Sequence, residues 1–102
     1  MEKDFLVKVH KTYRWVVAIC DKDIFGKKLE EGEHQLDLSG KFFDGDNVDV
    51  DGLNEIIEMC SYEDATFYIV GKKSVEHAKK IKIINEEGVK YIQEIPFALI
   101  LL

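Results

Sequence analysis

VVAICDKDIFGKKLEEGEHQLDL, residues 16–38, is the stretch that decides the fold of this chain. Its apolar run ends at Cys20, a polar connection with two glycines follows, and apolar residues alternate again from His34 to Leu38. A continuous β-branched run is typical of a strand covered on both faces, whereas alternation indicates a half-buried strand. The stretch therefore predicts a strand, a structured loop and a second strand.

The segments on either side extend this pattern. Alternating apolar residues from Phe5 to Val9 predict a strand that forms a hairpin with residues 13–19. Apolar residues at helical spacing predict helices over about 51–62 and 73–83. Further strands are expected over 65–70, 89–95 and 97–102, with Pro96 as a break between the last two. This order predicts a single α+β domain over residues 1–102, with a mostly antiparallel or mixed sheet of five to six strands and two helices packed on one face.

Composition limits the classes of function. With 102 residues, of which 46% are hydrophobic, the chain is long enough for one core and too short for two. Its formal charge of −6 and its single arginine, Arg14, oppose nonspecific nucleic-acid binding by the molecule as a whole. Cys20 and Cys60 stand apart without zinc-site spacing, and their redox state is left open. No secretory signal or membrane-length apolar run is present, so we expect a cytoplasmic protein without a cofactor or metal.

The acidic stretch from Asn47 to Glu58 has the residue spacing of an EF-hand calcium loop. However, its first ligand position is Asn47, and the segment before it is a Gly- and Asp-rich loop instead of a helix. An acidic first turn of a helix explains Asp49 and Asp51 without a metal. We therefore expect no calcium site here.

A candidate anion site follows the buried strand that ends at Val70. Backbone amides at a helix N-terminus, with lysines beside them, can bind a phosphate group. The second helix also carries further lysines, so we expect one basic surface able to follow an RNA backbone. The residues of this candidate site are Gly71, Lys72, Lys73, Ser74, Lys79 and Lys80.

No motif of a catalytic site is present in the sequence, and no catalytic residue is assigned. The alternative to a binding protein is a small-molecule enzyme with a cleft at the Cys20–Gly32 loop, where Cys20-Asp21 could provide a thiol near a strand end. Its candidate residues are Cys20, Asp21, Lys27 and Glu31. A buried structural cysteine is the competing interpretation, because a reactive thiol needs an electropositive and partly exposed setting.

Short motifs along nearly the whole chain resemble the archaeal domain-of-unknown-function family 424. They are Leu6-Val7-Lys8-Val9, Ala18-x-Cys20-Asp21, Gly26-Lys27 with Glu31-Gly32, Phe42-Phe43-x-Gly45, Val70-Gly71 before a helix with Ala78, Val89-x-x-Ile92 and Pro96-x-Ala98. The resemblance implies a small single-domain protein of mixed α and β structure without an established activity, and an association with translation-related proteins. The chain departs from its relatives at Phe97, where they tend to have histidine, so no role of that histidine carries over.

Together these features predict a non-enzymatic binding module. Its expected partner is RNA or a translation-related protein, and no membrane is involved. The apolar C-terminal segment, Phe97–Leu102, is expected to be a buried strand or a homodimer contact.

Overall fold

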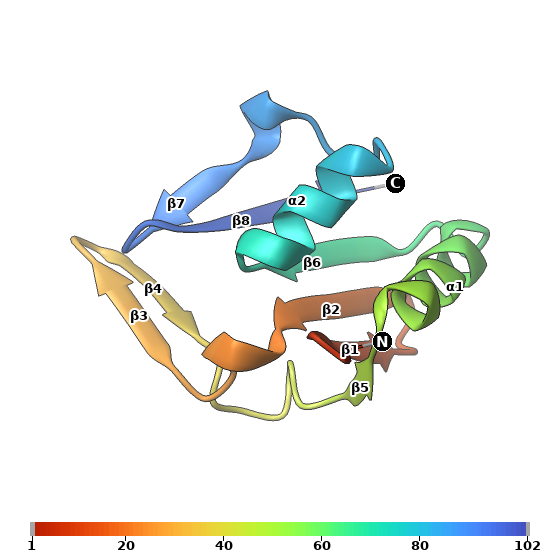
Figure 1. Cartoon of the computed structure of the whole chain (residues 1–102), viewed down its shortest axis with the longest axis horizontal. Helices are drawn as coiled ribbons and strands as arrows, with labels where there is room; N and C mark the ends of the chain where they lie inside the picture. The colour runs from red at the N-terminus through yellow and green to blue at the C-terminus, as the bar shows by residue number, and fades with distance from the viewer. Residues whose placement is uncertain (1, 102) are drawn as a thin grey trace.

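The computed structural model describes residues 2–101 as a sheet with helices on one side and a hairpin on the other (Figure 1). The label η marks a single 3₁₀ turn. The first half of the chain consists of β1 (Phe5–His10), β2 (Val16–Asp21), η1 (Lys22–Ile24), β3 (Lys28–Glu31), β4 (His34–Asp37) and β5 (Asp46–Val48). The second half consists of α1 (Val50–Ser61), β6 (Thr66–Val70), α2 (Lys72–Lys80), η2 (Glu86–Gly88), β7 (Lys90–Ile92) and β8 (Ile95–Leu101).

The main sheet is six-stranded and mixed. Its strand order is β5-β1-β2-β6-β8-β7, and the central pair β2–β6 is parallel while the other pairs are antiparallel. Strands β3 and β4 form a separate two-stranded hairpin. The predicted α+β class, with a mixed six-stranded sheet and two helices, is confirmed.

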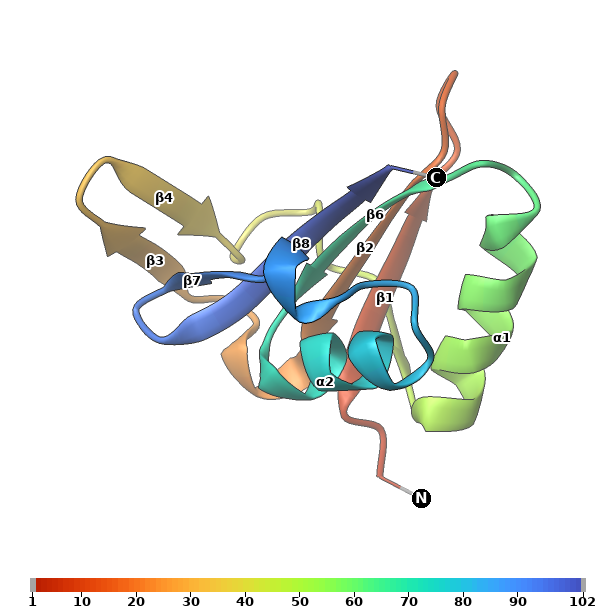
Figure 2. The ribbon, with the colours of Figure 1, turned by 90° about the horizontal axis from the view of Figure 1, so that it is seen from above.

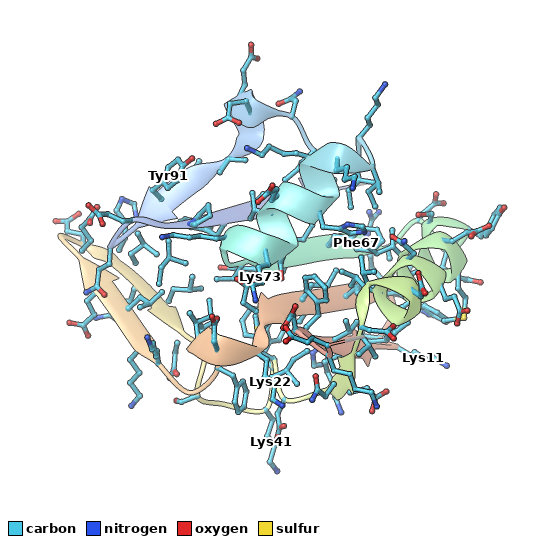
Figure 3. All side chains as sticks on the ribbon, viewed as in Figure 1. Lys11, Lys22, Lys41, Phe67, Lys73 and Tyr91 are labelled. Atoms are coloured by element: carbon cyan, nitrogen blue, oxygen red, sulfur yellow. The ribbon has the colours of Figure 1, made fainter. Side chains whose placement is uncertain are left out.

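Both helices pack on the same face of the main sheet. Leu53 and Ile57 of α1 and Val75 of α2 share one buried cluster with Phe67, which lies between the sheet and the helices (Figure 3). Helix α1 begins where the Asp49 carboxylate accepts a hydrogen bond from the Gly52 amide at 2.9 Å, an ordinary N-cap. The prediction that two helices cover one face is therefore confirmed.

The opposite face is covered at one end by the β3–β4 hairpin. Leu29, Leu36 and Leu38 pack there with Cys20 and Val70 in a second buried cluster. The hairpin lies beside the sheet at the end where β7 pairs with β8, and it leaves the other end of this face open (Figure 2). This half-covered face positions the surfaces discussed below.

Two strands and one break differ from the sequence prediction. Residues 28–31 and 46–48 were expected to be loop, yet they form β3 and β5, because each pairs with an antiparallel neighbour. Pro96 lies inside β8 instead of before it, at a position where β7 already makes the edge of the sheet. Leu102, the last residue of the predicted strand, lies outside the described residues.

The acidic segment forms a strand and a helix instead of a calcium loop. Asn47 lies in β5, Asp49 caps α1, and Asp51 and Glu58 belong to α1 itself. Among the described residues, 2–101, no group of three or more acidic, histidine or cysteine side chains is arranged to hold a metal ion. No helix within that part of the chain is long and apolar enough to cross a membrane.

Candidate functional site

The carboxyl ends of the parallel strands β2 and β6 bring Asp21, from one predicted group of site residues, to the start of α2, which carries the other group. The Asp21 carboxylate, buried at the end of β2, accepts hydrogen bonds from the first turn of α2, which follows β6. The donors are the Lys73 amide at 3.0 Å, the Ser74 amide at 2.8 Å and the Ser74 hydroxyl at 2.6 Å. An aspartate distant in sequence therefore caps this helix in place of a local capping residue.

Gly71 permits the close approach of this carboxylate. Its φ of 113° is a conformation that favours glycine, and a Cβ atom there would lie 2.4 Å from the Asp21 Cγ atom. The glycine is therefore needed both for the turn from β6 into α2 and for the space that Asp21 fills.

This geometry changes the meaning of the predicted anion site. The amides that would bind a phosphate already donate to a carboxylate of the same chain, which also complements the positive end of the helix dipole. A cavity of about 310 Å³ adjoins them, lined in part by Asp23, Lys72 and Lys73. An external phosphate could reach these amides only by displacing Asp21.

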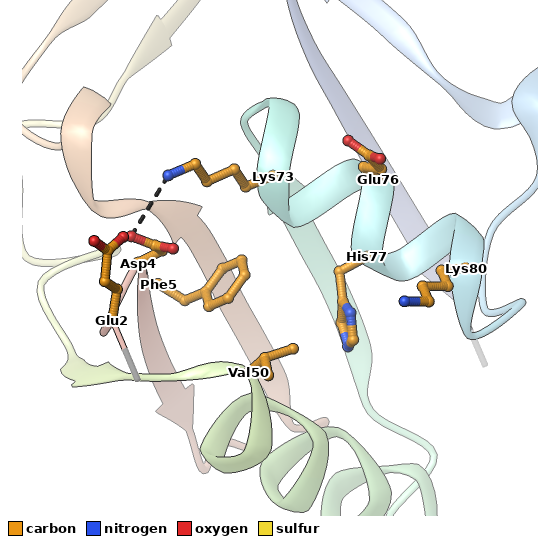
Figure 4. A pocket seen from close by; sticks show the side chains of 8 residues that line it. All are labelled: Glu2, Asp4, Phe5, Val50, Lys73, Glu76, His77 and Lys80. Carbon is orange, nitrogen blue, oxygen red and sulfur yellow. Dashed lines mark ion pairs between the residues drawn. The ribbon is translucent and has the colours of Figure 1, made fainter.

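The lysines of α2 do not form one surface. Lys73 and Lys80 border a cavity of about 470 Å³ beside the N-terminal segment (Figure 4), whereas Lys72 and Lys79 border another on the side of β7. Residues seven apart share a helical stripe, but adjacent residues are turned by about 100°. The four lysines therefore lie along two stripes, which come together at the start of the helix, where Lys72 and Lys73 line one cavity.

Acidic side chains also offset the charge of these lysines. The Lys73 ammonium lies 3.5 Å from the Asp4 carboxylate, and the Lys79 ammonium lies 2.7 Å from that of Glu86. The hydrogen bond to Glu86 raises the pKa of Lys79. Glu76 borders both cavities, so each stripe of lysines faces a carboxylate.

His77 lies in the larger cavity and joins the two helices. Its Nε2 atom is 2.6 Å from the Asn54 Oδ1 atom of α1, and its ring lies 6.3 Å from that of Phe5. Burial, followed by the charge of Lys80, lowers the pKa of His77. The histidine therefore has a structural role between α1 and α2.

The candidate enzyme residues do not converge on one cleft. Cys20 is fully buried, and burial followed by the charges of Asp21 and Asp23 raises the pKa of its thiol to about 12. A thiol of this kind stays protonated and cannot line a solvent-filled cleft. Lys27 and Glu31 are exposed at the hairpin, where the Glu31 carboxylate accepts a hydrogen bond from the Gln93 amide at 3.0 Å. The structure therefore favours the competing interpretation of Cys20, a buried structural cysteine.

A different surface lies at the amino end of the parallel pair, on the half-covered face. In the register of the sheet, one row crosses β1, β2, β6 and β8 and consists of His10, Val16, Thr66 and Leu101. The His10 ring stacks on Phe42 with a centroid distance of 4.7 Å, and its Nε2 atom lies 2.9 Å from the Phe42 carbonyl oxygen. The loop before β5 is thereby held against β1.

Cations and an exposed aromatic ring occur on the segments that carry this stack. Lys8 lies on the same face as His10, and Lys41 precedes Phe42 and points away from the sheet (Figure 3). The β1–β2 turn projects beyond the other strands (Figure 2) and carries exposed Arg14 and a fully exposed Tyr13. We call this set the basic–aromatic surface; it consists of Lys8, His10, Tyr13, Arg14, Lys41 and Phe42.

Sequence reasoning missed this surface, although one signal for it was available. Residues 8–20 contain two lysines and the single arginine of the chain, and they contain no acidic residue. Lys11 belongs to that run but its ammonium lies over the Trp15 ring, 5.1 Å from the centroid, and Trp15 packs against the helix-side core. The contact between Phe42 and His10, 32 residues apart, could not be read from the sequence.

Comparison with known proteins identifies the family but no activity. A crystal structure of an uncharacterized conserved protein from Methanopyrus kandleri has the same fold, with a TM-score of 0.81 and 20% sequence identity over 94% of this chain and 89% of that one. No curated protein matches the chain. The family model described as protein of unknown function (DUF424) matches residues 9–102. The match to nearly the whole chain shows that this protein belongs to the DUF424 family, as its sequence motifs indicated.

Proposed function

We propose that this protein is a non-enzymatic binding module that contacts single-stranded RNA through the basic–aromatic surface. The observation that carries the proposal is the projecting β1–β2 turn, which carries exposed Tyr13 and Arg14 and follows directly after His10 of the His10–Phe42 stack. The family resemblance implies that the RNA, or a protein bound with it, belongs to the translation apparatus.

The chemistry of the surface matches the needs of an unpaired RNA segment. Aromatic side chains stack on bases without strong sequence preference, and a guanidinium can bind a phosphate in a bidentate manner. Lys8, two residues before His10 on the same strand, and Lys41, next to Phe42 in the sequence, add point charges. With three cations in contact, the logarithm of the binding constant should fall with a slope of about −2 against the logarithm of salt concentration.

A second candidate surface is the start of α2, where Lys72 and Lys73 line one cavity together. It would bind RNA by charge alone, because Asp21 already occupies the helix amides. The acidic residues Asp21 and Asp23 line the same cavity and weaken the attraction for phosphate. Residues 8–20 contain no carboxylate, although Lys8 lines a cavity with Asp44 and Asp46.

The test compares two double variants with equal changes in net charge. Anisotropy of a labelled single-stranded oligonucleotide at low salt is measured for the wild type, for Arg14→Glu/Lys41→Glu and for Lys72→Glu/Lys73→Glu. We expect the first variant to lose more than about tenfold in affinity and the second to lose less than about threefold, since each lost phosphate contact costs about 1 kcal/mol.

Two results would overturn this assignment. If the α2 variant is the one that loses binding, the RNA surface lies at α2. If the wild type binds no RNA even at low salt, the RNA proposal fails and a protein partner becomes the better hypothesis. Thermal melts of all three proteins serve as the control for folding, because every substituted side chain is exposed.

A further inference from the structure

The outer half of β8 has an open edge. Strand β7 pairs with β8 only over Ile95–Phe97, whereas β6 pairs with it over Phe97–Leu101. Residues 98–101 therefore have a strand on one side and, within residues 2–101, no strand on the other. Figure 1 shows how β7 and the η2 turn diverge from β8 before its end. Four residues of backbone are thus left to pair with another strand.

This edge lacks the usual protection against pairing. Exposed edges normally carry lysine, proline or a bulge that blocks the approach of a second strand. Strand β8, IPFALIL, contains no charged residue, and Pro96 lies in the part already paired with β7. Beside the open edge, Leu99 and Leu101 are 59% and 71% exposed on the half-covered face. An unprotected edge flanked by exposed leucines is typical of an interface.

We propose that this edge pairs with the same edge of a second copy, so that two six-stranded sheets join into one. Identical strands related by a twofold axis run antiparallel, and each contributes the same surface to the contact. When the axis is perpendicular to the sheet, opposite residues lie on the same face. One such register places Leu99 opposite the Leu101 of the other copy, which buries both pairs of leucines.

The chemistry of the edge favours an uncharged strand over a charged partner, and a second copy presents the same uncharged strand. Each chain has a net charge of −6, so two copies repel each other except where their surfaces are neutral. The edge at residues 98–101 is neutral. Lys8 lies on β1, three strands away from β8, or about 14 Å at the usual strand spacing. The cations of the two copies would therefore not meet at the axis, and the two basic–aromatic surfaces would lie on the same side of the joined sheet.

The experiment measures mass in solution by light scattering on RNase-treated protein, so its result does not depend on RNA binding. We expect the wild type to be a dimer and Leu99→Lys to be a monomer with an unchanged circular dichroism spectrum. The control is Met59→Lys on α1, where an apolar residue of similar exposure, 53%, is replaced away from the edge. It should remain a dimer.

A mixing experiment keeps the proposal falsifiable if the lysine variant folds poorly. Leu99→Lys and Leu101→Glu should each be monomeric, and an equimolar mixture should form the mixed dimer, because the introduced lysine and glutamate would then lie directly opposite each other across the joined edge. A wild type that stays monomeric at its highest soluble concentration would overturn the proposal. So would a Leu99→Lys protein that remains dimeric, because the contact would then lie elsewhere.

Discussion

The two ends of the parallel pair β2–β6 use positive charge in opposite ways. At the carboxyl end, the amides of α2 and nearby lysines surround Asp21, a buried carboxylate of the same chain. At the amino end, Arg14 and Tyr13 project into solvent on the β1–β2 turn, and no acidic residue occurs between residues 8 and 20. The first end resembles a ligand site by its residue types, but its amides already donate to Asp21 and so hold β2 to α2. At the second end, the side chains of Arg14 and Tyr13 remain exposed to solvent.

The N-terminus of a helix can bind an external anion only if its amides remain without another acceptor. Most buried backbone donors in a folded protein are satisfied, and here a distant side chain satisfies two of them. In a chain that lacked Asp21, the same amides, glycine and lysines would be available to bind a phosphate group.

The largest effect is expected from Gly71→Ala. The new Cβ atom would collide with the Asp21 carboxylate in a backbone conformation that disfavours alanine, at a cost of about 4 kcal/mol in the free energy of unfolding. Gly26→Ala is the matched control, because Gly26 also has a positive φ but has open space at the Cβ position. Its cost should be about 1 kcal/mol. Equal losses in urea unfolding would show that Asp21 does not crowd Gly71.

A somewhat smaller loss is expected from Asp21→Ala. Removal of the carboxylate leaves three donors of α2 without their acceptor, which should cost about 3 kcal/mol. The vacated position should then accept an external anion, so sulfate should raise the melting temperature of Asp21→Ala more than that of the wild type. An equal response of both proteins would contradict the view that Asp21 fills an anion site.

At the amino end, the expected effect is on binding and not on stability. Tyr13→Ala should weaken the affinity for a single-stranded oligonucleotide about tenfold, because one base loses its stacking partner. Tyr62→Ala is the control, since Tyr62 is 82% exposed in the turn after α1, outside the basic–aromatic surface. Anisotropy titrations of both variants measure the difference. If the two tyrosines matter equally, or neither matters, the turn is not the contact.

The smallest effect is a change in pH dependence at His77. Burial and Lys80 lower the pKa of His77 below the value of 6.5 that an unfolded chain would have. The unfolded state therefore binds more protons as the pH falls through that value, and stability decreases on acidification. His77→Gln should reduce this slope between about pH 7 and pH 5. Urea titrations at several pH values compare the variant with the wild type, and an unchanged slope would contradict the prediction.

The sequence predicted the fold class and both helices because their signals are local. Apolar spacing defines α1 and α2, and continuous apolar runs define β2 and β6. Strands β3 and β5 were missed because three or four residues, such as Asp46–Val48, carry little periodicity and owe their conformation to pairing. The contact of Asp21 with Ser74 joins positions 53 residues apart, so no local pattern could reveal that the anion site was filled.

Each of the two cysteines can report the opening of the layer of the molecule that covers it. Cys20 is buried in the cluster on the side of the β3–β4 hairpin. Cys60 is buried in the cluster between the sheet and the two helices. Neither thiol can be alkylated until the layer above it opens. Because local openings have separate free energies, the alkylation rate at each thiol measures the stability of one layer without any engineered label. This small chain therefore already contains the reporters needed to learn whether its hairpin and its helices open together or one at a time.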